Sequence, residues 1–217
     1  MLHILIQNQY IFLHGFLTTV QLLGCIILIG IPVGILLGIV GGRYSAGVAY
    51  TIKGFRFVTK VIPVLVLLFW LHYPLQAFLG IVVNPFWTAA FVLGLINMSA
   101  TANVVTVELE LLPRAYREAG ITLGMSKGEV IRHIELPLLF RRIIPQLLLN
   151  QTLMLEYTLF ASLISVPELF RVAQTVNSMI YKPVEIYSLL VVFFFIILAP
   201  LHWLISWLQK KYATKYA

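Results

Sequence analysis

Charge is scarce in this sequence: Asp, Glu, Lys and Arg make up 11% of its 217 residues, against roughly 25% in an ordinary soluble domain. Hydrophobic residues make up 60%, and they fill several long runs rather than one tail. About 18 or more apolar residues with few charges are enough to cross a bilayer as a helix. The composition therefore excludes an ordinary soluble domain and predicts an integral membrane protein.

Residues that carry covalent or metal chemistry are also few. Cys25 is the only cysteine, so an intrachain disulfide is excluded, and we expect it to be a small buried hydrophobe. None of the five histidines stands at metal-ligand spacing from another, so we expect no metal site. The sequence lacks a phosphate-binding Gly-x-x-x-x-Gly-Lys-Ser/Thr loop, a nucleophile elbow and a His-Glu-x-x-His helix. We therefore expect no catalytic residues, no cofactor held by this chain and no enzymatic activity of its own.

Five apolar runs are long enough to span a membrane. They predict an all-α membrane protein in which residues 1–217 form a single transmembrane domain. The predicted spans cover residues 12–40, 58–79, 86–107, 138–166 and 184–208.

The net charge of +7 is better explained by topology than by a nucleic-acid partner, since Lys and Arg mark the cytoplasmic loops of membrane proteins. Thirteen of the fifteen basic residues follow the first span, follow the third span or lie in the C-terminal tail. Only Arg171 and Lys182 fall on the other side. We therefore expect the N-terminus outside and the C-terminus in the cytoplasm. The loop expected after the first span carries four of these basic residues: Arg43, Lys53, Arg56 and Lys60.

Four glycines in the first span share one helix face, because they are spaced four residues apart. Small residues at this spacing let a second helix approach closely, so we expect helix packing here. Pro32 lies in the same run and is expected to kink it. The four glycines are Gly30, Gly34, Gly38 and Gly42.

The segment between the third and fourth spans predicts two short helices with a tight turn between them. Pro113 suits the first helical position, and Gly124 suits the left-handed residue after a helix. Ser126 and Glu129 form the Ser-x-x-Glu pattern of a capping box, which begins a second helix. Pro137 either ends that helix or opens the fourth span.

The same segment, residues 113–137, resembles the EAA loop of bacterial ABC importer permeases. The family pattern is Glu-Ala-Ala, three residues, Gly, nine residues, Ile-x-Leu-Pro, and only Gly120 departs from it, in place of the second Ala. A glycine costs about 1 kcal/mol in a helix interior, so we expect slight fraying there. The resemblance implies a type I ABC importer fold and a cytoplasmic coupling loop that docks on a separate ATPase; a self-capped loop with no partner is the alternative. The implied contact residues are Glu118, Ala119, Gly120, Gly124, Ile134, Leu136 and Pro137.

The wider chain is most similar to the polar amino-acid (histidine/glutamine-type) permeases of this superfamily. The matching segments are residues 15–19, 60–63, 161–169 and 171–174. Residues 156–160 depart from a Lys-Asp-Thr-Ser-Leu sequence that is frequent in the family. The family also often carries a Glu and an Arg near positions 103 and 106, where this chain has the neutral residues Asn103 and Thr106. Because of these departures, the resemblance does not specify which solute is transported.

Polar residues inside predicted spans suggest a solute pathway, because buried ionisable groups usually face a cavity or a partner. We hypothesise that Asn97, Thr101, Asn103 and Glu156 line it. Hydrogen bonding between packed helices is the alternative. An acidic side chain in the pathway would suit a cationic solute.

The resemblance implies a multi-pass protein of the bacterial cytoplasmic (inner) membrane. It implies an ABC ATPase dimer that binds ATP and Mg, a second permease that is identical or related, an external solute-binding protein and membrane lipid as partners, and no nucleic acid. The predicted function is alternating-access import of a polar amino acid or similar small solute. The alternatives are an ABC permease for a different small solute, a secondary transporter or a membrane-embedded enzyme.

Overall fold

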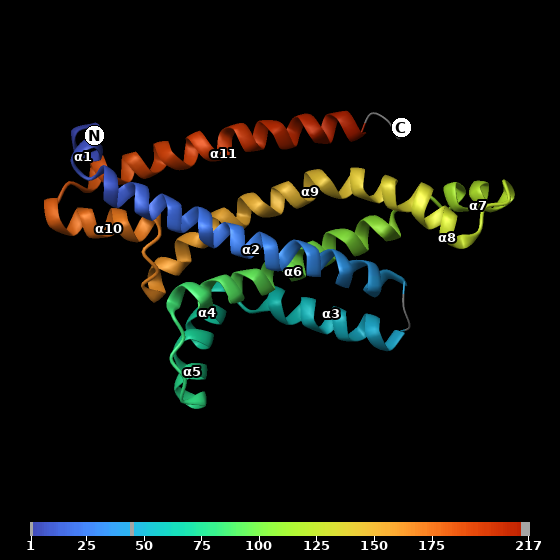
Figure 1. The fold of residues 1–217 in the computed structure, drawn as a ribbon, viewed down its shortest axis with the longest axis horizontal. Helices are drawn as coiled ribbons and strands as arrows, with labels where there is room; N and C mark the ends of the chain where they lie inside the picture. The colour runs from blue at the N-terminus through green and yellow to red at the C-terminus, as the bar shows by residue number, and fades with distance from the viewer. Residues whose placement is uncertain (1, 44–45, 214–217) are drawn as a thin grey trace.

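Long helices lying side by side dominate the computed structural model, which describes residues 2–43 and 46–213 (Figure 1). Four helices form the body of the bundle: α2 (Gln9–Arg43), α6 (Pro85–Glu110), α9 (Leu136–Tyr157) and α11 (Pro183–Ala213). Short helices α7 (Arg114–Thr122) and α8 (Lys127–Val130) project from one end of the bundle. Helix α10 (Leu169–Ile180) and the N-terminal α1 (Leu2–Gln7) lie at the other end.

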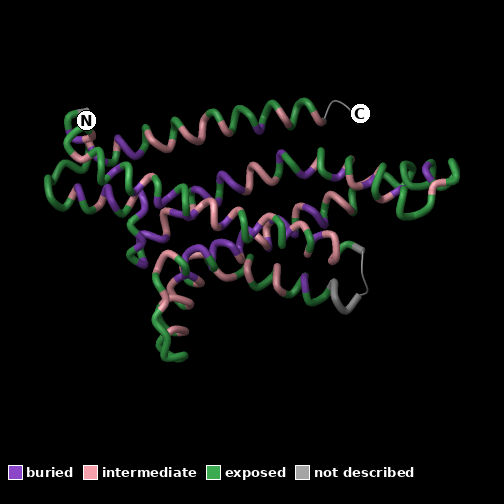
Figure 2. Tube along the Cα trace, viewed as in Figure 1, coloured by how far each residue is buried: buried purple, intermediate pink, exposed green. Residues whose placement is uncertain are grey.

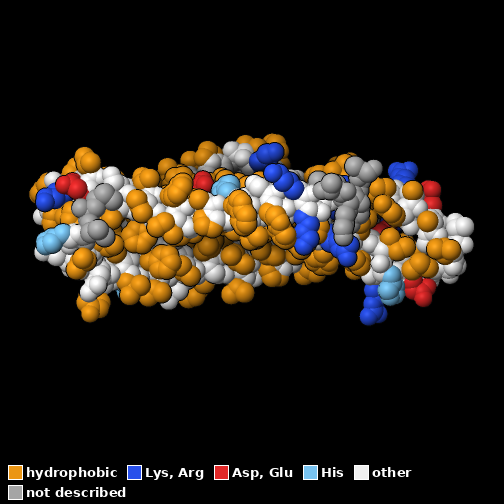
Figure 3. Space-filling model, turned by 90° about the horizontal axis from the view of Figure 1, so that it is seen from above, with side chains coloured by type: hydrophobic (Ala, Val, Ile, Leu, Met, Phe, Trp, Pro, Cys, Tyr) orange, Lys and Arg blue, Asp and Glu red, His pale blue; other side chains and the backbone are white. Residues whose placement is uncertain are grey.

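Four of the five predicted spans are confirmed as helices that are long and apolar enough to cross a bilayer. They are Gln9–Gly42, Pro85–Glu110, Lys127–Ile164 and Pro183–Tyr212. The third of these joins α8, a π turn η1 (Ile131–Glu135), α9 and a 3-10 segment η2 (Thr158–Ile164). Figure 3 shows hydrophobic side chains over most of one face, with basic side chains gathered toward the half that carries α7 and α8.

The remaining predicted span, residues 58–79, is not one continuous helix but part of a bent pair of helices that together are long and apolar enough to cross a bilayer. Helix α3 begins at Ala46 and ends at Val61, and α4 (Val64–His72) and α5 (Pro74–Leu79) follow. The two parts, Tyr50–Val61 and Val64–Leu79, are bent by 96°. Pro63 explains the break, because it lacks an N–H and restricts the residue before it.

This course also corrects the expected loop after the first span. Lys53, Arg56 and Lys60 are helical residues of α3, which packs against α6, while Arg43 ends α2. Lys215, one of the basic residues of the predicted cytoplasmic tail, lies outside the described residues. The basic residues of α3 therefore lie on a helix rather than in a loop; Lys53 and Lys60 are exposed and Arg56 is half-buried.

Close approach of α2 and α6 forms the centre of the fold. A Cβ atom added at Gly30, Gly34 or Gly38 would lie 2.6, 2.6 or 2.5 Å from an α6 side chain. No real Cβ tolerates such a contact, so the two helices approach at the distance that only glycine allows. The facing pairs are Gly30 with Asn97, Gly34 with Thr101, Gly38 with Val105 and Gly42 with Leu109.

Burial follows this central pair. Figure 2 shows the buried positions concentrated in the middle of the bundle, whereas α11 is exposed along most of its length. One core cluster joins Leu22, Leu68 and Leu93, from α2, α4 and α6, to side chains of α9 and η2. The exposed side of α11 is apolar, including Val191, Phe195 and Trp203.

At the end of the bundle opposite α7, a buried acid caps α10, and the neighbouring backbone bonds to α2. The Glu168 carboxylate accepts hydrogen bonds from the backbone N–H groups of Phe170 and Arg171, at 2.8 and 2.7 Å. The Leu169 N–H donates to the Thr19 hydroxyl at 3.0 Å. Burial raises the pKa of Glu168 to about 7, although the two backbone N–H groups favour the charged form. Glu168 therefore serves as the N-cap of α10.

Candidate functional site: the terminal helix pair and a polar hollow

The turn between α7 and α8 has the predicted cap. Gly124 has φ +82°, in the left-handed region. Its N–H donates to the Ile121 carbonyl at 2.9 Å, and the Met125 N–H donates to the Gly120 carbonyl at 3.1 Å. These two bonds make a Schellman motif, which satisfies the last carbonyls of α7. The prediction for Gly124 is confirmed, and Pro113 precedes the first helical residue by one position.

The start of α8 carries the predicted capping box. The Ser126 N–H donates to the Glu129 carboxylate at 2.8 Å, and the Glu129 N–H donates to the Ser126 hydroxyl at 3.4 Å. The chain then passes through η1 into α9 without interruption, so α8 is not a separate helix. The Leu136 N–H bonds to the Ile131 carbonyl, five residues back. This wider turn places Pro137 in the first turn of α9, where its missing N–H is tolerated.

Gly120 is the point where α7 rests on the following helix. It is buried, and an added Cβ would lie 2.9 Å from Ile134 Cδ1 and 3.0 Å from Val130 Cγ2. The departure from alanine at this position thus coincides with a close contact between the two helices. The slight fraying expected at Gly120 is not observed, since α7 continues to Thr122.

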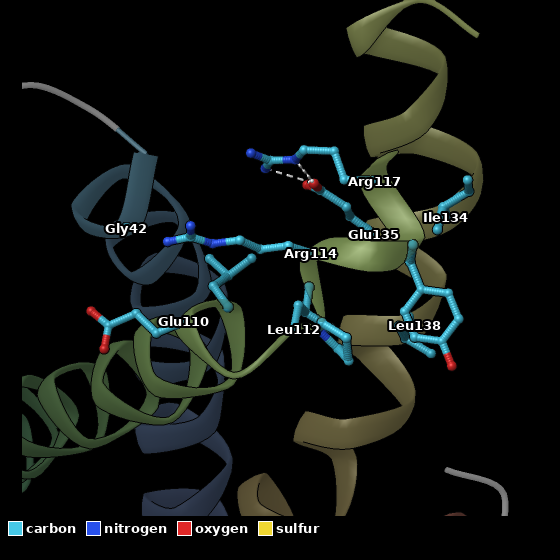
Figure 4. A pocket seen from close by; sticks show the side chains of 11 residues that line it. Gly42, Glu110, Leu112, Arg114, Arg117, Ile134, Glu135 and Leu138 are labelled. Carbon is cyan, nitrogen blue, oxygen red and sulfur yellow. Dashed lines mark hydrogen bonds and ion pairs between the residues drawn. The ribbon is translucent and has the colours of Figure 1, made fainter. Parts of the chain in front are cut away.

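A charge pair joins α7 to η1 beside this contact (Figure 4). Arg117 Nε and Nη2 each lie 2.7 Å from Oε1 of Glu135. The Glu135 side chain is 9% exposed, whereas that of Arg117 is 61% exposed. A buried carboxylate needs such a partner, so the pair holds α7 in one orientation. No local sequence pattern indicates this pair, because the two residues are 18 positions apart.

The pair borders a pocket of about 380 Å³ at the base of α7. In Figure 4, Arg114 extends from α7 toward the ends of α2 and α6, where Gly42 and Glu110 lie. The pocket separates the charged face of α7 from the transmembrane helices.

The implied ATPase-contact residues divide into an outer and an inner set. Glu118 and Ala119 are exposed on α7, and the neighbouring Leu123 is 82% exposed. Gly120 is buried beside Ile134, which is half-buried, whereas Leu136 is half-buried against the core cluster of Val105, Leu139 and Ile143. Pro137 and Gly124 are exposed. The structure therefore brings Gly120 and Ile134 into contact and leaves Glu118 and Ala119 exposed on α7, but it does not gather all seven residues on one surface.

A second feature is a polar hollow of about 670 Å³ between α3, α6 and α9. Arg56 Nη2 donates a hydrogen bond to Asn103 Oδ1 across it. The hydroxyl oxygens of Thr59 and Ser99 lie 2.6 Å apart. Other polar side chains that line it are Lys53, Lys60 and Asn150.

The four residues hypothesised to line a pathway are not gathered in one place. Asn103 faces the polar hollow. Asn97 is fully buried and exchanges two hydrogen bonds of 3.1 Å with Gln151. Thr101 is fully buried against Gly34. Glu156 is exposed and does not line the hollow. Burial favours helix packing as the role of Asn97 and Thr101.

Comparisons with known proteins agree with this architecture. A family profile described as "Binding-protein-dependent transport system inner membrane component" matches residues 30–214. The glutamine transport system permease protein GlnP of Escherichia coli strain K12 is 32% identical over 187 residues, which cover 84% of each chain. The glutamate/aspartate import permease protein GltK of Escherichia coli O6:H1 is 23% identical, over 93% of each chain.

Two solved structures share the fold. A crystal structure of an amino acid ABC transporter with histidines superposes with a TM-score of 0.87 at 20% identity, over 95% of this chain and 96% of that one. An inward-facing structure of the MetNI methionine ABC transporter gives a TM-score of 0.70 at 17% identity, over 93% and 98%.

Proposed function

The chain belongs to the family of inner-membrane components of binding-protein-dependent transport systems, and from this premise we propose that it imports a polar amino acid or a similar small solute. It is a permease subunit of an ABC importer in the inner membrane. The proposal of an amino acid rests on what the relatives are named for, glutamine in one case and glutamate or aspartate in another.

The helix pair α7–α8 is the proposed contact with a separate ATPase. The observation that carries this proposal is that Glu118, Ala119 and Leu123 are exposed on α7 and its C-terminal cap. Contacts at both ends of α7 hold it in place. Gly124 fixes the turn, and the Arg117–Glu135 pair fixes the base. A rigid α7 transmits motion of a bound subunit to η1 through the Arg117–Glu135 pair, and η1 continues into α9 without a break.

In this proposal ATP and Mg are bound by the ATPase dimer, and the permease holds neither. The α7 end of the bundle faces the cytoplasm together with the C-terminus, and the N-terminus and α10 face outward. A solute-binding protein then docks on the α10 end. A second permease, identical or related, completes the pathway beside the polar hollow, since one chain leaves that hollow open. Coordinated ATP-driven motion of both permeases gives alternating access.

The ATPase contact can be tested by copurification. Glu118→Lys is expected to reduce the recovery of the ATPase with the permease at least about tenfold, because it reverses a charge at the centre of the exposed surface. The matched control is Glu185→Lys, which reverses a charge in the first turn of α11, at the opposite end of the bundle.

Recovery should be measured with a tagged permease, together with solute-stimulated ATP hydrolysis in vesicles. Loss of the ATPase from Glu118→Lys alone supports the proposal. Equal recovery with both variants would refute this contact. Uptake driven by an ion gradient, with no ATPase attached, would instead identify a secondary transporter.

A further inference from the structure

We propose that the polar hollow between α3, α6 and α9 holds a carboxylate group of the transported solute, with Arg56 and Lys60 as its positive partners. This inference rests on the proposed function and names the chemistry that the pathway recognises. It differs from the expectation of a cationic solute, which depended on Glu156.

The hollow carries positive charge that no lining acid of the described chain compensates. Lys53, Arg56 and Lys60 are spaced so that they share one face of α3, and all three line the hollow. No Asp or Glu lines it among the residues that the structure describes. The side-chain partner of Arg56 is the neutral amide of Asn103. Glu110 attracts Arg56 from the end of α6, but the two form no ion pair within residues 2–43 and 46–213.

The hollow also lies well inside the membrane-spanning part of α6. Ser99 and Asn103, which face α3 across the hollow, lie 11 and 7 residues before the end of α6 at Glu110. At 1.5 Å per residue they lie about 16 and 10 Å from that end, within a hydrocarbon core of about 30 Å. Cations at this depth face a cavity or a partner rather than lipid. We therefore infer that the basic face of α3 faces the hollow within the membrane and does not serve only as a topology signal.

The wall of the hollow also has a hydrogen-bond donor that the described residues leave unpaired. Asn150 lines the hollow from α9, and its buried Nδ2 has no hydrogen-bond partner in the described part of the chain. An amide donor left unpaired near cations is matched by an acceptor with a negative charge. A carboxylate has two such oxygens. Phe57 and Tyr157 supply apolar surface beside these groups for the rest of a small solute.

Glu156 does not oppose this assignment. It is exposed on α9 and lies outside the lining of the hollow, so it does not neutralise Arg56 or Lys60 there. Asn103 is the one member of the hypothesised pathway that the hollow contains. Its bond to the Arg56 guanidinium orients that group across the hollow.

The test is equilibrium binding to the purified permease–ATPase complex in detergent, without the external receptor. The probes are the standard L-amino acids and, for each one that binds, the amine that lacks its carboxylate. We expect the acid to bind at least about tenfold more tightly than the amine, because a charge-assisted hydrogen bond is lost with the carboxylate. Arg56→Gln should remove most of this preference by weakening the acid alone, whereas Arg56→Lys should retain part of it.

Arg141→Gln is the charge-matched control, because Arg141 is exposed on α9 and lies outside the hollow. Thermal unfolding of each complex checks that the variants are folded. The inference is overturned if the amine binds as well as the acid, if Arg56→Gln keeps the preference, or if no L-amino acid binds the wild-type complex. Any of these results can occur while the ATPase still copurifies and receptor-dependent uptake continues, so failure of the inference is distinguishable from failure of the proposed function.

Discussion

Alanine at Gly34 is expected to cause a large loss of folded protein and, with it, of transport. Its Cβ would lie 2.6 Å from Thr101 Cβ and 2.7 Å from the backbone oxygen of Met98 on α6. Backbone cannot rotate away as a flexible side chain does, so α2 and α6 must separate along their shared length. Such overpacking costs about 1–3 kcal/mol, and it would also weaken the contacts of Gly30 and Gly38.

Gly24 provides the matched control in the same helix. A Cβ added there meets nothing within 4 Å, so Gly24→Ala should be neutral or slightly stabilising, because alanine is the better helix former. The measurement is the thermal unfolding midpoint of the detergent-purified protein, with membrane yield as a second readout. Equal midpoints for the two variants would show that α2 and α6 do not depend on the glycine face.

Alanine at Gly124 is expected to reduce ATPase binding while leaving the transmembrane bundle folded. The backbone φ of +82° costs a residue with a Cβ about 1–2 kcal/mol, and the turn must relax by moving α7. A change of this size corresponds to roughly 5–30-fold in an equilibrium. The ATPase affinity of the purified permease should fall by that factor, because the exposed surface of α7 is displaced from its support.

A substitution at Gly128 tests whether the reduced ATPase affinity comes from the left-handed backbone at Gly124 or from the loss of any glycine. It lies in α8, four residues further on, and an added Cβ meets nothing within 4 Å. Gly128→Ala should keep full affinity for the ATPase. If the Gly124 and Gly128 variants bind the ATPase equally well, the left-handed turn is not needed for docking.

Local chemistry explains why the α7–α8 turn could be predicted from the sequence. A left-handed cap at Gly124 and a capping box from Ser126 to Glu129 depend on residues within a few positions of one another. The glycine spacing on α2 likewise predicts a packing face without naming its partner. For the glycine face, the helical period alone shows that residues four positions apart lie on one side.

The bend of the second span could not be read from hydropathy, because the apolar run continues through Pro63. A signal was present in the polar residues: Lys53, Arg56 and Lys60 repeat with helical spacing before that proline, which is typical of a helix rather than a loop. The position of Glu156 depended on the rotation of α9 about its axis. The Asn97–Gln151 and Arg117–Glu135 contacts join distant segments, so only the tertiary structure reveals them.

The proposed contact between α7 and a separate ATPase can be tested directly by crosslinking. Cys25 is the only cysteine, so a Cys25→Ser background allows single cysteines to be placed at Ala119 on α7 and at Ser178 on α10, both of which are exposed. Treatment of membranes with a short thiol-reactive photo-crosslinker should join the ATPase subunit to the Ala119→Cys permease and not to the Ser178→Cys permease. An ATPase adduct at both positions, or at neither, would contradict the account.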